Sequence, residues 1–237
     1  RVHWFWKFGD SEQSFKTYAL KQGDTTQRLT SGPVYEWVQS IDVPAKRTPL
    51  KELPQVKGTP FNLEELSEFL FDRGVASGTI ANLLREIDEL IRIAKWYRKF
   101  DNPSESETVA YLVVPLLRAL GWTPQKMAIE WNRVDLALFN SLPRCDDGLT
   151  VVVEAKKKDS SCLSALSQAQ AYAESRPSCH RLIVTDGIRF GIYSRSKSGF
   201  RLHAYMNLTK LQNSYPVYHC GGVNEAILAM TPEWNQS

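Results

Sequence analysis

Several features that define other protein classes are missing from this chain. Its 4 cysteines stand far apart and form no Cys-x-x-Cys pair, and its 4 histidines are scattered, so neither a disulfide framework nor a zinc site of the usual spacing is expected. The longest apolar run is far too short to cross a bilayer, and no signal peptide is visible. We therefore expect free thiols, no membrane association and a cytoplasmic location.

Motifs of several enzyme classes are also absent, and the charge is nearly balanced. No phosphate-binding glycine loop, dinucleotide fingerprint or Ser-His-Asp series occurs in the sequence. The formal net charge is only +3 over 237 residues, so any surface that binds nucleic acid must be local. The candidate residues for such a surface are Lys156 to Lys158, Arg181, Arg189, Arg195, Lys197 and Arg201. The chain begins at Arg1 rather than Met, from which we expect a longer protein.

The most informative segments are two apolar runs that each carry charged residues. Val134 to Phe139 contains Asp135, and Val151 to Lys156 ends in Glu154-Ala-Lys156. Side chains alternate across a strand, so Glu154 and Lys156 share one face. The connection between the two runs is rich in turn formers and predicts an antiparallel hairpin that brings the charges together. Two carboxylates this close repel unless a cation lies between them, and carboxylate oxygens suit Mg²⁺.

Glu-x-Lys alone occurs by chance in many proteins, and a strand end with solvated charges would explain it. The strong hydrophobicity of both runs weighs against that reading, because strands buried on both faces rarely carry charges without a reason. The sequence therefore favours a site at this hairpin.

The flanking segments predict alternating helices and strands. A helix is expected from a cap at Ser104 to Gly121, and another from Ser161 to Ser175 with Gln168 and Tyr172 on one face. Two strands joined by a tight turn at Asp186-Gly187 follow, and a further strand is expected from Phe200 to Leu208.

Taken in order, these segments resemble the PD-(D/E)xK nucleases, especially the N-terminal nuclease domain of type I restriction enzyme R subunits and related restriction endonucleases. The resemblance covers residues 102 to 208. The matching pieces are Glu105-Ser-Glu-Thr108 with Pro115-Leu-Leu117 and Leu120-Gly-Trp122, Val134-Asp135, Glu154-Ala-Lys156, Gln168-Ala-Gln-Ala-Tyr172 and Thr185-Asp-Gly187. No helicase follows this segment, so the translocating activity of R subunits is not carried over.

The resemblance implies a role for each matching residue. Asp135 and Glu154 would hold Mg²⁺, for which Mn²⁺ can substitute, and Lys156 would position or help activate the attacking water. The family's first-helix acid best matches Glu105, with Glu107 as the fallback. Gln168 and Tyr172 would contact DNA or support the site, although a polar edge of an amphipathic helix explains Tyr172 equally well.

The region before residue 102 divides again. Residues 1–60 form an accessory segment: alternating aromatics from Arg1 to Val43 predict a few strands, and a proline-rich connection follows from Pro44 to Pro60. Residues 61–101 predict two helices, capped by Asn62 and Ser77. The pair resembles a helix-turn-helix, but the second helix is longer than a recognition helix, so we favour a hairpin that packs on the core.

The sequence thus predicts an α/β protein with a restriction-endonuclease-like core, a mixed sheet flanked by helices, over residues 102–237. A small β-rich and helical accessory region precedes it. The predicted function is a Mg²⁺-dependent DNA endonuclease in a restriction or phage-defence system, acting as a homodimer or with further domains or subunits. The main alternative is a non-catalytic nucleic-acid-binding or assembly module on the same fold. An RNA-directed or repair nuclease would share the same site.

Overall fold

The computed structural model describes residues 61–100, 102–157, 162–215 and 218–234, all of which belong to the unit formed by residues 57–237. The strands predicted within residues 1–60 and the connection from Pro44 to Pro60 lie outside the described residues. Among the described helices, none combines the length and hydropathy needed to cross a membrane.

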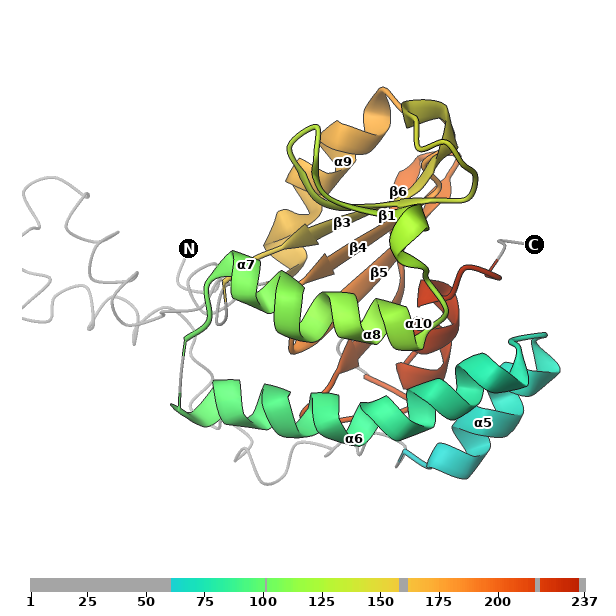
Figure 1. The fold of residues 1–237 in the computed structure, drawn as a ribbon, viewed down its shortest axis with the longest axis vertical. Helices are drawn as coiled ribbons and strands as arrows, with labels where there is room; N and C mark the ends of the chain where they lie inside the picture. Colours follow the sequence, from blue (N-terminus) through green and yellow to red (C-terminus); the bar gives the residue numbers. More distant parts are fainter. Residues whose placement is uncertain (1–60, 101, 158–161, 216–217, 235–237) are drawn as a thin grey trace, which may run out of the picture. The chain divides into compact units, whose positions relative to one another are not determined.

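A six-stranded sheet forms the centre of this unit (Figure 1). Its strands lie in chain order, and all neighbours are antiparallel except β3 and β4, which are parallel. The strands are β1 (Met127–Trp131), β2 (Val134–Phe139), β3 (Leu149–Ala155), β4 (Arg181–Thr185), β5 (Arg189–Ser196) and β6 (Gly199–Asn207). The predicted α/β class with a mixed sheet flanked by helices is confirmed.

Helices cover both faces of the sheet, and each face has its own core. Helix α9 (Leu166–Glu174), preceded by the short η6 (Cys162–Ala165), packs on one face against Ala137, Val152 and Val184. The opposite face packs against α5 (Leu63–Asp72), α6 (Ser77–Phe100), α8 (Val114–Ala119) and α10 (Val223–Met230) through Leu136, Val153 and Ile183. Figure 1 shows α9 on one side of the strands and α6 with α8 on the other.

The two helices α5 and α6 form part of this second core. The Asn62 side chain caps α5 by accepting the Glu64 amide, as expected of an N-cap asparagine. Leu66 and Leu70 of α5, with Leu83 and Ile87 of α6, are buried in the cluster that includes the sheet. The interpretation as a packing hairpin is confirmed for these described residues.

The helix that begins at Ser104 is not a regular α-helix throughout. It consists of α7 (Glu105–Thr108), a π-helical turn η3 (Val109–Val113) and α8. The cause is Pro115, which has no amide hydrogen and would clash with the carbonyl group four residues before it, that of Tyr111. Widening the helix lets the Val114 amide bond to the Val109 carbonyl instead. The predicted helix from Ser104 to Gly121 is present, and the π-helical turn within it was not predicted.

Candidate active site

Three charged residues meet on the face of the sheet that α9 covers. The β2–β3 register pairs Leu136 with Val153, and continuing it by one residue places Asp135 opposite Glu154. Opposed residues of antiparallel strands project on the same face. Lys156 follows two residues after Glu154, just past the end of β3, so the predicted hairpin brings all three side chains together as expected.

Hydrogen bonds fix Lys156 between two elements. Its Nζ donates to Glu154 Oε1 at 2.9 Å and to Gln168 Oε1 at 3.0 Å. The Gln168 Nε2 group lies 3.4 Å from the Tyr172 hydroxyl, one helical turn further along α9. Gln168 therefore positions Lys156, and Tyr172 contacts Gln168, so the structure brings both predicted α9 residues to the site.

Glu154 is the most buried member of the site. Its side chain is 0 % exposed, and while Oε1 accepts from Lys156, Oε2 has no hydrogen-bond partner. Burial raises the pKa of Glu154 to about 7; the Lys156 hydrogen bond opposes this shift, and the Asp135 charge adds to it. Without a cation, this carboxyl group therefore holds its proton until near neutral pH.

Asp135 is partly buried and is held by the backbone of the next strand. Its Oδ2 accepts from the Ala155 amide at 2.7 Å. Burial raises the pKa of Asp135; the Ala155 amide and Lys156 oppose this shift, while the charges of Glu105 and Glu130 reinforce it. At both carboxyl groups, the positive charge of Lys156 is thus too small to offset burial and the neighbouring negative charges.

Burial by itself disfavours the ammonium form of Lys156. The hydrogen bond to Glu154, followed by the charges of Glu154, Glu105 and Asp135, outweighs burial, so the pKa of Lys156 is raised. Lys156 therefore remains positively charged at any pH at which the site could work.

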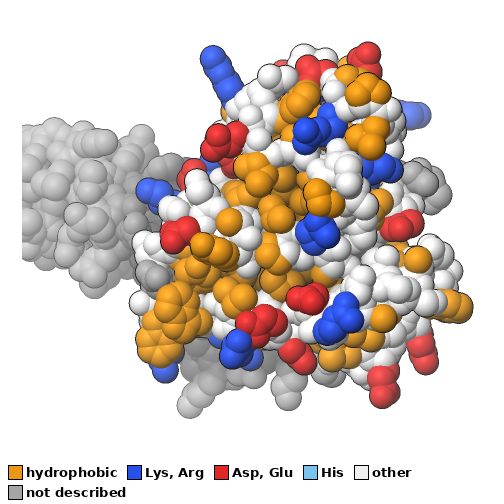
Figure 2. Space-filling model, viewed as in Figure 1, with side chains coloured by type: hydrophobic (Ala, Val, Ile, Leu, Met, Phe, Trp, Pro, Cys, Tyr) orange, Lys and Arg blue, Asp and Glu red, His pale blue; other side chains and the backbone are white. Residues whose placement is uncertain are grey.

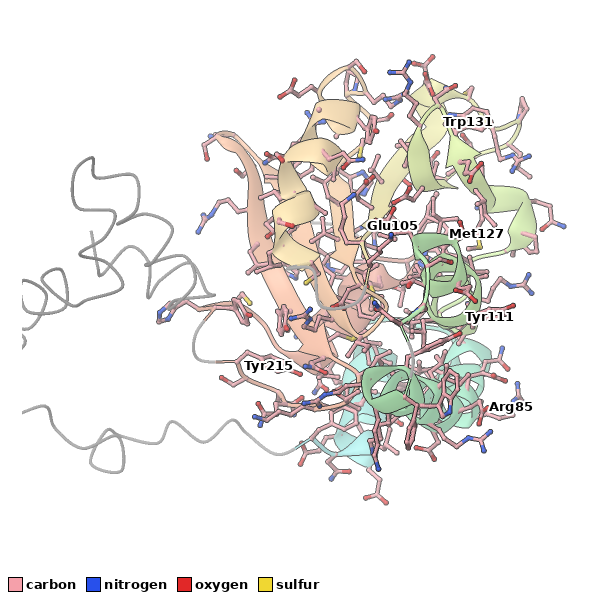
Figure 3. All side chains as sticks on the ribbon, turned by 90° about the vertical axis from the view of Figure 1, so that its left-hand side faces the viewer. Arg85, Glu105, Tyr111, Met127, Trp131 and Tyr215 are labelled. Carbon is pink, nitrogen blue, oxygen red and sulfur yellow. The ribbon has the colours of Figure 1, made fainter. Side chains whose placement is uncertain are left out.

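The two first-helix acids have different surroundings. Glu107 closes a capping box: its Oε2 accepts from the Ser104 amide at 2.8 Å, and its own amide donates to the Ser104 hydroxyl. Glu105 is half-buried, and its charge acts on Asp135, Glu154 and Lys156. Figure 3 shows Glu105 at the beginning of its helix. Glu105 thus acts electrostatically on all three site residues, whereas the Glu107 carboxylate is engaged in the capping box.

The position of this helix is set by the turn between β4 and β5. Gly187 has a φ of +79°, and a Cβ atom there would lie 2.7 Å from Thr108 Cγ2 and 2.8 Å from Leu112 Cδ1. The turn is held by Asp186, whose Oδ1 accepts from the amides of Ile188 and Arg189. The helix that carries Glu105 therefore packs directly against the Thr185-Asp-Gly187 turn.

Glu130, on the edge strand β1, also acts on the site. It is exposed, and the β1–β2 register leaves it opposite Asp135, with a left-handed φ of 55°. Its charge contributes to the raised pKa of Asp135. Recognising this from the sequence would have required predicting β1, which brings Glu130 alongside β2.

Three of the basic residues predicted to form a DNA-binding surface make structural contacts. Arg181 is 2 % exposed and donates to the carbonyl groups of Ala229 and Thr231. Arg189 pairs with the buried Asp186. Arg195 donates to backbone carbonyl groups that include that of Cys179. The prediction is therefore wrong for Arg181, which is buried, whereas Arg189 and Arg195 are partly exposed and bond to oxygen atoms of the protein. Lys157, Lys197 and Arg201 are exposed, and Lys158 lies outside the described residues.

The residues present fit a hard divalent cation, although no three His, Cys, Asp or Glu side chains of the described segments are grouped as a ready-made cluster. The unpartnered Oε2 of Glu154 and the opposed carboxylate of Asp135 supply oxygen donors. A Mg²⁺ ion retains several waters and is commonly held by one or two carboxylates. Two protein carboxylates with solvent or phosphate oxygens would therefore be sufficient.

Comparison with known proteins gives one structural similarity. No family model matches the chain, and no curated protein matches it. A solved fragment assigned to an HsdR subunit of a type I restriction enzyme from Vibrio vulnificus YJ016 is 21% identical, with a TM-score of 0.33. The similarity covers 43% of this chain and 23% of that one. This chain thus spans less than a quarter of the length of that protein.

Proposed function

We propose that this protein is a Mg²⁺-dependent endodeoxyribonuclease that hydrolyses phosphodiester bonds, working in the cytoplasm as part of a restriction or phage-defence system. The observation that supports this most directly is the pairing of a buried, half-satisfied Glu154 with Asp135 on one side and Lys156 on the other. A buried carboxylate oxygen without a hydrogen-bond partner is costly, and a bound cation would supply the missing interaction.

Each residue has a distinct task in this proposal. Asp135 and Glu154 bind the cation, and Glu154 must release its proton to do so because its pKa is about 7 in the free site. When bound, Mg²⁺ would polarise the scissile phosphate and lower the pKa of a water molecule. Glu105 contributes a third negative charge at the edge of the site, which favours the cation further.

Lys156 supplies the positive charge that a phosphodiester requires. Its ammonium group is held by Glu154 and Gln168 rather than rotating freely, so its charge is fixed in position before DNA arrives. A fixed charge stabilises the extra negative charge of the phosphorane transition state without first reorganising. Gln168 acts through Lys156 as a positioning residue.

The test is cleavage of supercoiled plasmid DNA with Mg²⁺ or Mn²⁺. Asp135→Ala, Glu154→Ala and Lys156→Ala should each reduce cleavage by about a hundredfold or more while the circular dichroism spectrum is unchanged. Asp147→Ala is the matched control, since Asp147 is an exposed carboxylate in the same β2–β3 connection. This variant should cleave DNA as the wild type does. Retained cleavage in two of the three site variants would refute the assignment.

Binding without cleavage would instead support the non-catalytic alternative. We expect DNA binding in EDTA to weaken steeply with salt and to differ little between unrelated duplexes, since the exposed basic residues are of the kind that contacts phosphates. A wild-type chain that binds in this way but never cuts would identify a binding module. A strong sequence preference that survives high salt would assign base recognition to α6.

A further inference from the structure

A groove of about 590 Å³ lies between α6 and the helix formed by η3 and α8, away from the candidate active site. Leu90 and Tyr97 are buried along it, whereas Trp96 and Tyr111 remain 48 % and 53 % exposed. Figure 2 shows hydrophobic side chains gathered over the C-terminal end of α6 and over α8. The lining consists of Glu86, Glu89, Leu90, Arg92, Ile93, Trp96, Tyr97, Tyr111 and Pro115.

The aromatic side of the groove is built into the fold. Tyr111 lies in the π-helical turn that Pro115 imposes, and Pro115 itself lines the groove. Figure 3 shows Tyr111 and Arg85 on the same outer side of the molecule. Partly exposed Trp and Tyr side chains beside buried aliphatic ones are typical of the centre of a protein interface. A groove of this composition therefore indicates a protein surface as its occupant.

The charges along α6 are separated by sign. Glu86, Asp88 and Glu89 precede the centre of the exposed face, and Arg92, Lys95 and Lys99 follow it. Arg85, at the acidic end, is hydrogen-bonded to Asn82 and lies 3.7 Å from Glu86. A second helix with the same charges would be repelled if parallel and attracted if antiparallel.

We propose that the occupant is a second copy of this chain, bound through an antiparallel pairing of the two α6 helices about a two-fold axis. Such an axis relates identical surfaces, so residue i meets residue j and j meets i. With the axis passing between Glu89 and Arg92, Glu89 of each copy would face Arg92 of the other copy. Their existing ion pair, with nitrogen and oxygen 2.6 Å apart, would become part of a four-charge network.

Burial of the aromatic groups supplies the affinity, and the charges select the orientation. Exposed ion pairs contribute little affinity by themselves. Trp96 and Tyr111 would lose their contact with water on pairing, which is the larger favourable contribution. This inference concerns assembly and does not depend on the proposed nuclease activity.

The first experiment measures molar mass by sedimentation equilibrium over a wide concentration range. We expect a concentration-dependent monomer–dimer equilibrium for the wild-type chain and a monomer for Trp96→Glu and Tyr111→Lys. Phe71→Glu is the matched control: Phe71 is 63 % exposed on α5 but does not line the groove, so this variant should dimerise as wild type does. A wild-type chain that stays monomeric throughout would overturn the proposal.

A second experiment tests the orientation. Glu89→Arg makes both central positions positive in one chain, and Arg92→Glu makes both negative in another. Each variant alone should dimerise about tenfold or more weakly than wild type, and an equimolar mixture should regain a dimer containing one chain of each kind. Thermal unfolding of each variant checks that its monomer is folded. A mixture that associates no better than the separate variants would exclude the antiparallel pairing.

Discussion

Gly187 lies against Thr108 so closely that no side chain fits between them. A Cβ atom added to Gly187 would be 2.7 Å from Thr108 Cγ2, which is shorter than real Cβ contacts. Thr108 is fully buried and begins the turn that follows Glu105 on the first helix. The absence of one methyl group in the β4–β5 turn therefore lets the first helix, which carries Glu105, approach the sheet.

Gly187→Ala should both destabilise the fold and impair the site. Ala at this φ of +79° costs about 1 kcal/mol in backbone strain, and the contacts with Thr108 and Leu112 add about 2 kcal/mol. Gly74→Ala separates the two effects, because Gly74 has a φ of +81° but open space around its Cβ position. Urea denaturation should show the larger loss for Gly187→Ala, and equal losses would mean that the helix does not rest on this turn.

Glu105→Gln should lower the rate of Mg²⁺-dependent cleavage much more than Glu107→Gln does. Removing the Glu105 charge takes away one of the causes of the raised pKa values of Asp135 and Glu154, and weakens the pull on a cation. Gln at position 107 can still accept from the Ser104 amide in the capping box, so that variant should be nearly neutral. Single-turnover cleavage rates at saturating DNA measure both, and the reverse ranking would assign the role to Glu107.

Much of the site could be predicted from the sequence because its signals are local. The apolar run from Val134 to Phe139 and the one ending at Lys156 predict strands, and the turn formers between them predict the hairpin. Ser104 followed by Glu107 at the third helical position is the pattern of a capping box, and the helix does begin there. In each case the residues that decide the structure lie within a few positions of one another.

The features that were missed depend on distant contacts. The strand Met127–Trp131 is a short edge strand that turns into the next through Asn132 and Arg133, both at positive φ without a glycine to signal it. Arg181 bonds to carbonyl groups 48 and 50 residues away, so its structural role is invisible from its neighbours. Helix α10 and its C-cap Thr231, which provide those carbonyl groups, were not predicted either. Without them, a basic residue beside a strand resembled a phosphate contact.

Glu154 should make the metal-free protein less stable as pH rises, while the half-buried His180 and His203, whose pKa values are lowered by burial, act in the opposite direction. The pKa of this carboxyl group is about 7 in the folded protein and 4.5 when unperturbed. Between these values the unfolded chain has released the proton and the folded chain has not, so the free energy of unfolding decreases with pH until about 7. The difference corresponds to at most about 3 kcal/mol. The raised pKa of Asp135 acts in the same direction.

Urea denaturation in EDTA between about pH 5 and about pH 8 measures this dependence. Glu154→Gln should flatten it, since an amide carries no titrating proton, and should be at least as stable as wild type at the alkaline end. Asp147→Asn provides the control for removing an ordinary exposed carboxylate. The difference between wild type and Glu154→Gln isolates this carboxyl group from the opposite contribution of His180 and His203. An identical pH dependence in wild type and Glu154→Gln would contradict a buried, protonated Glu154.

Mg²⁺ should reverse the alkaline loss of stability. A cation that binds only the folded state stabilises it by mass action, by about 2.7 kcal/mol at a hundredfold excess over its dissociation constant. Because Asp135 and Glu154 lie opposite each other with too little positive charge, the increase in melting temperature should appear with Mg²⁺ or Mn²⁺ and grow as Glu154 loses its proton above about pH 7. It should shrink in Asp135→Ala, shrink again when Glu154 is also replaced, and persist in Asp147→Ala. An equal metal-induced shift in all of these variants would show that the ion binds elsewhere on the protein.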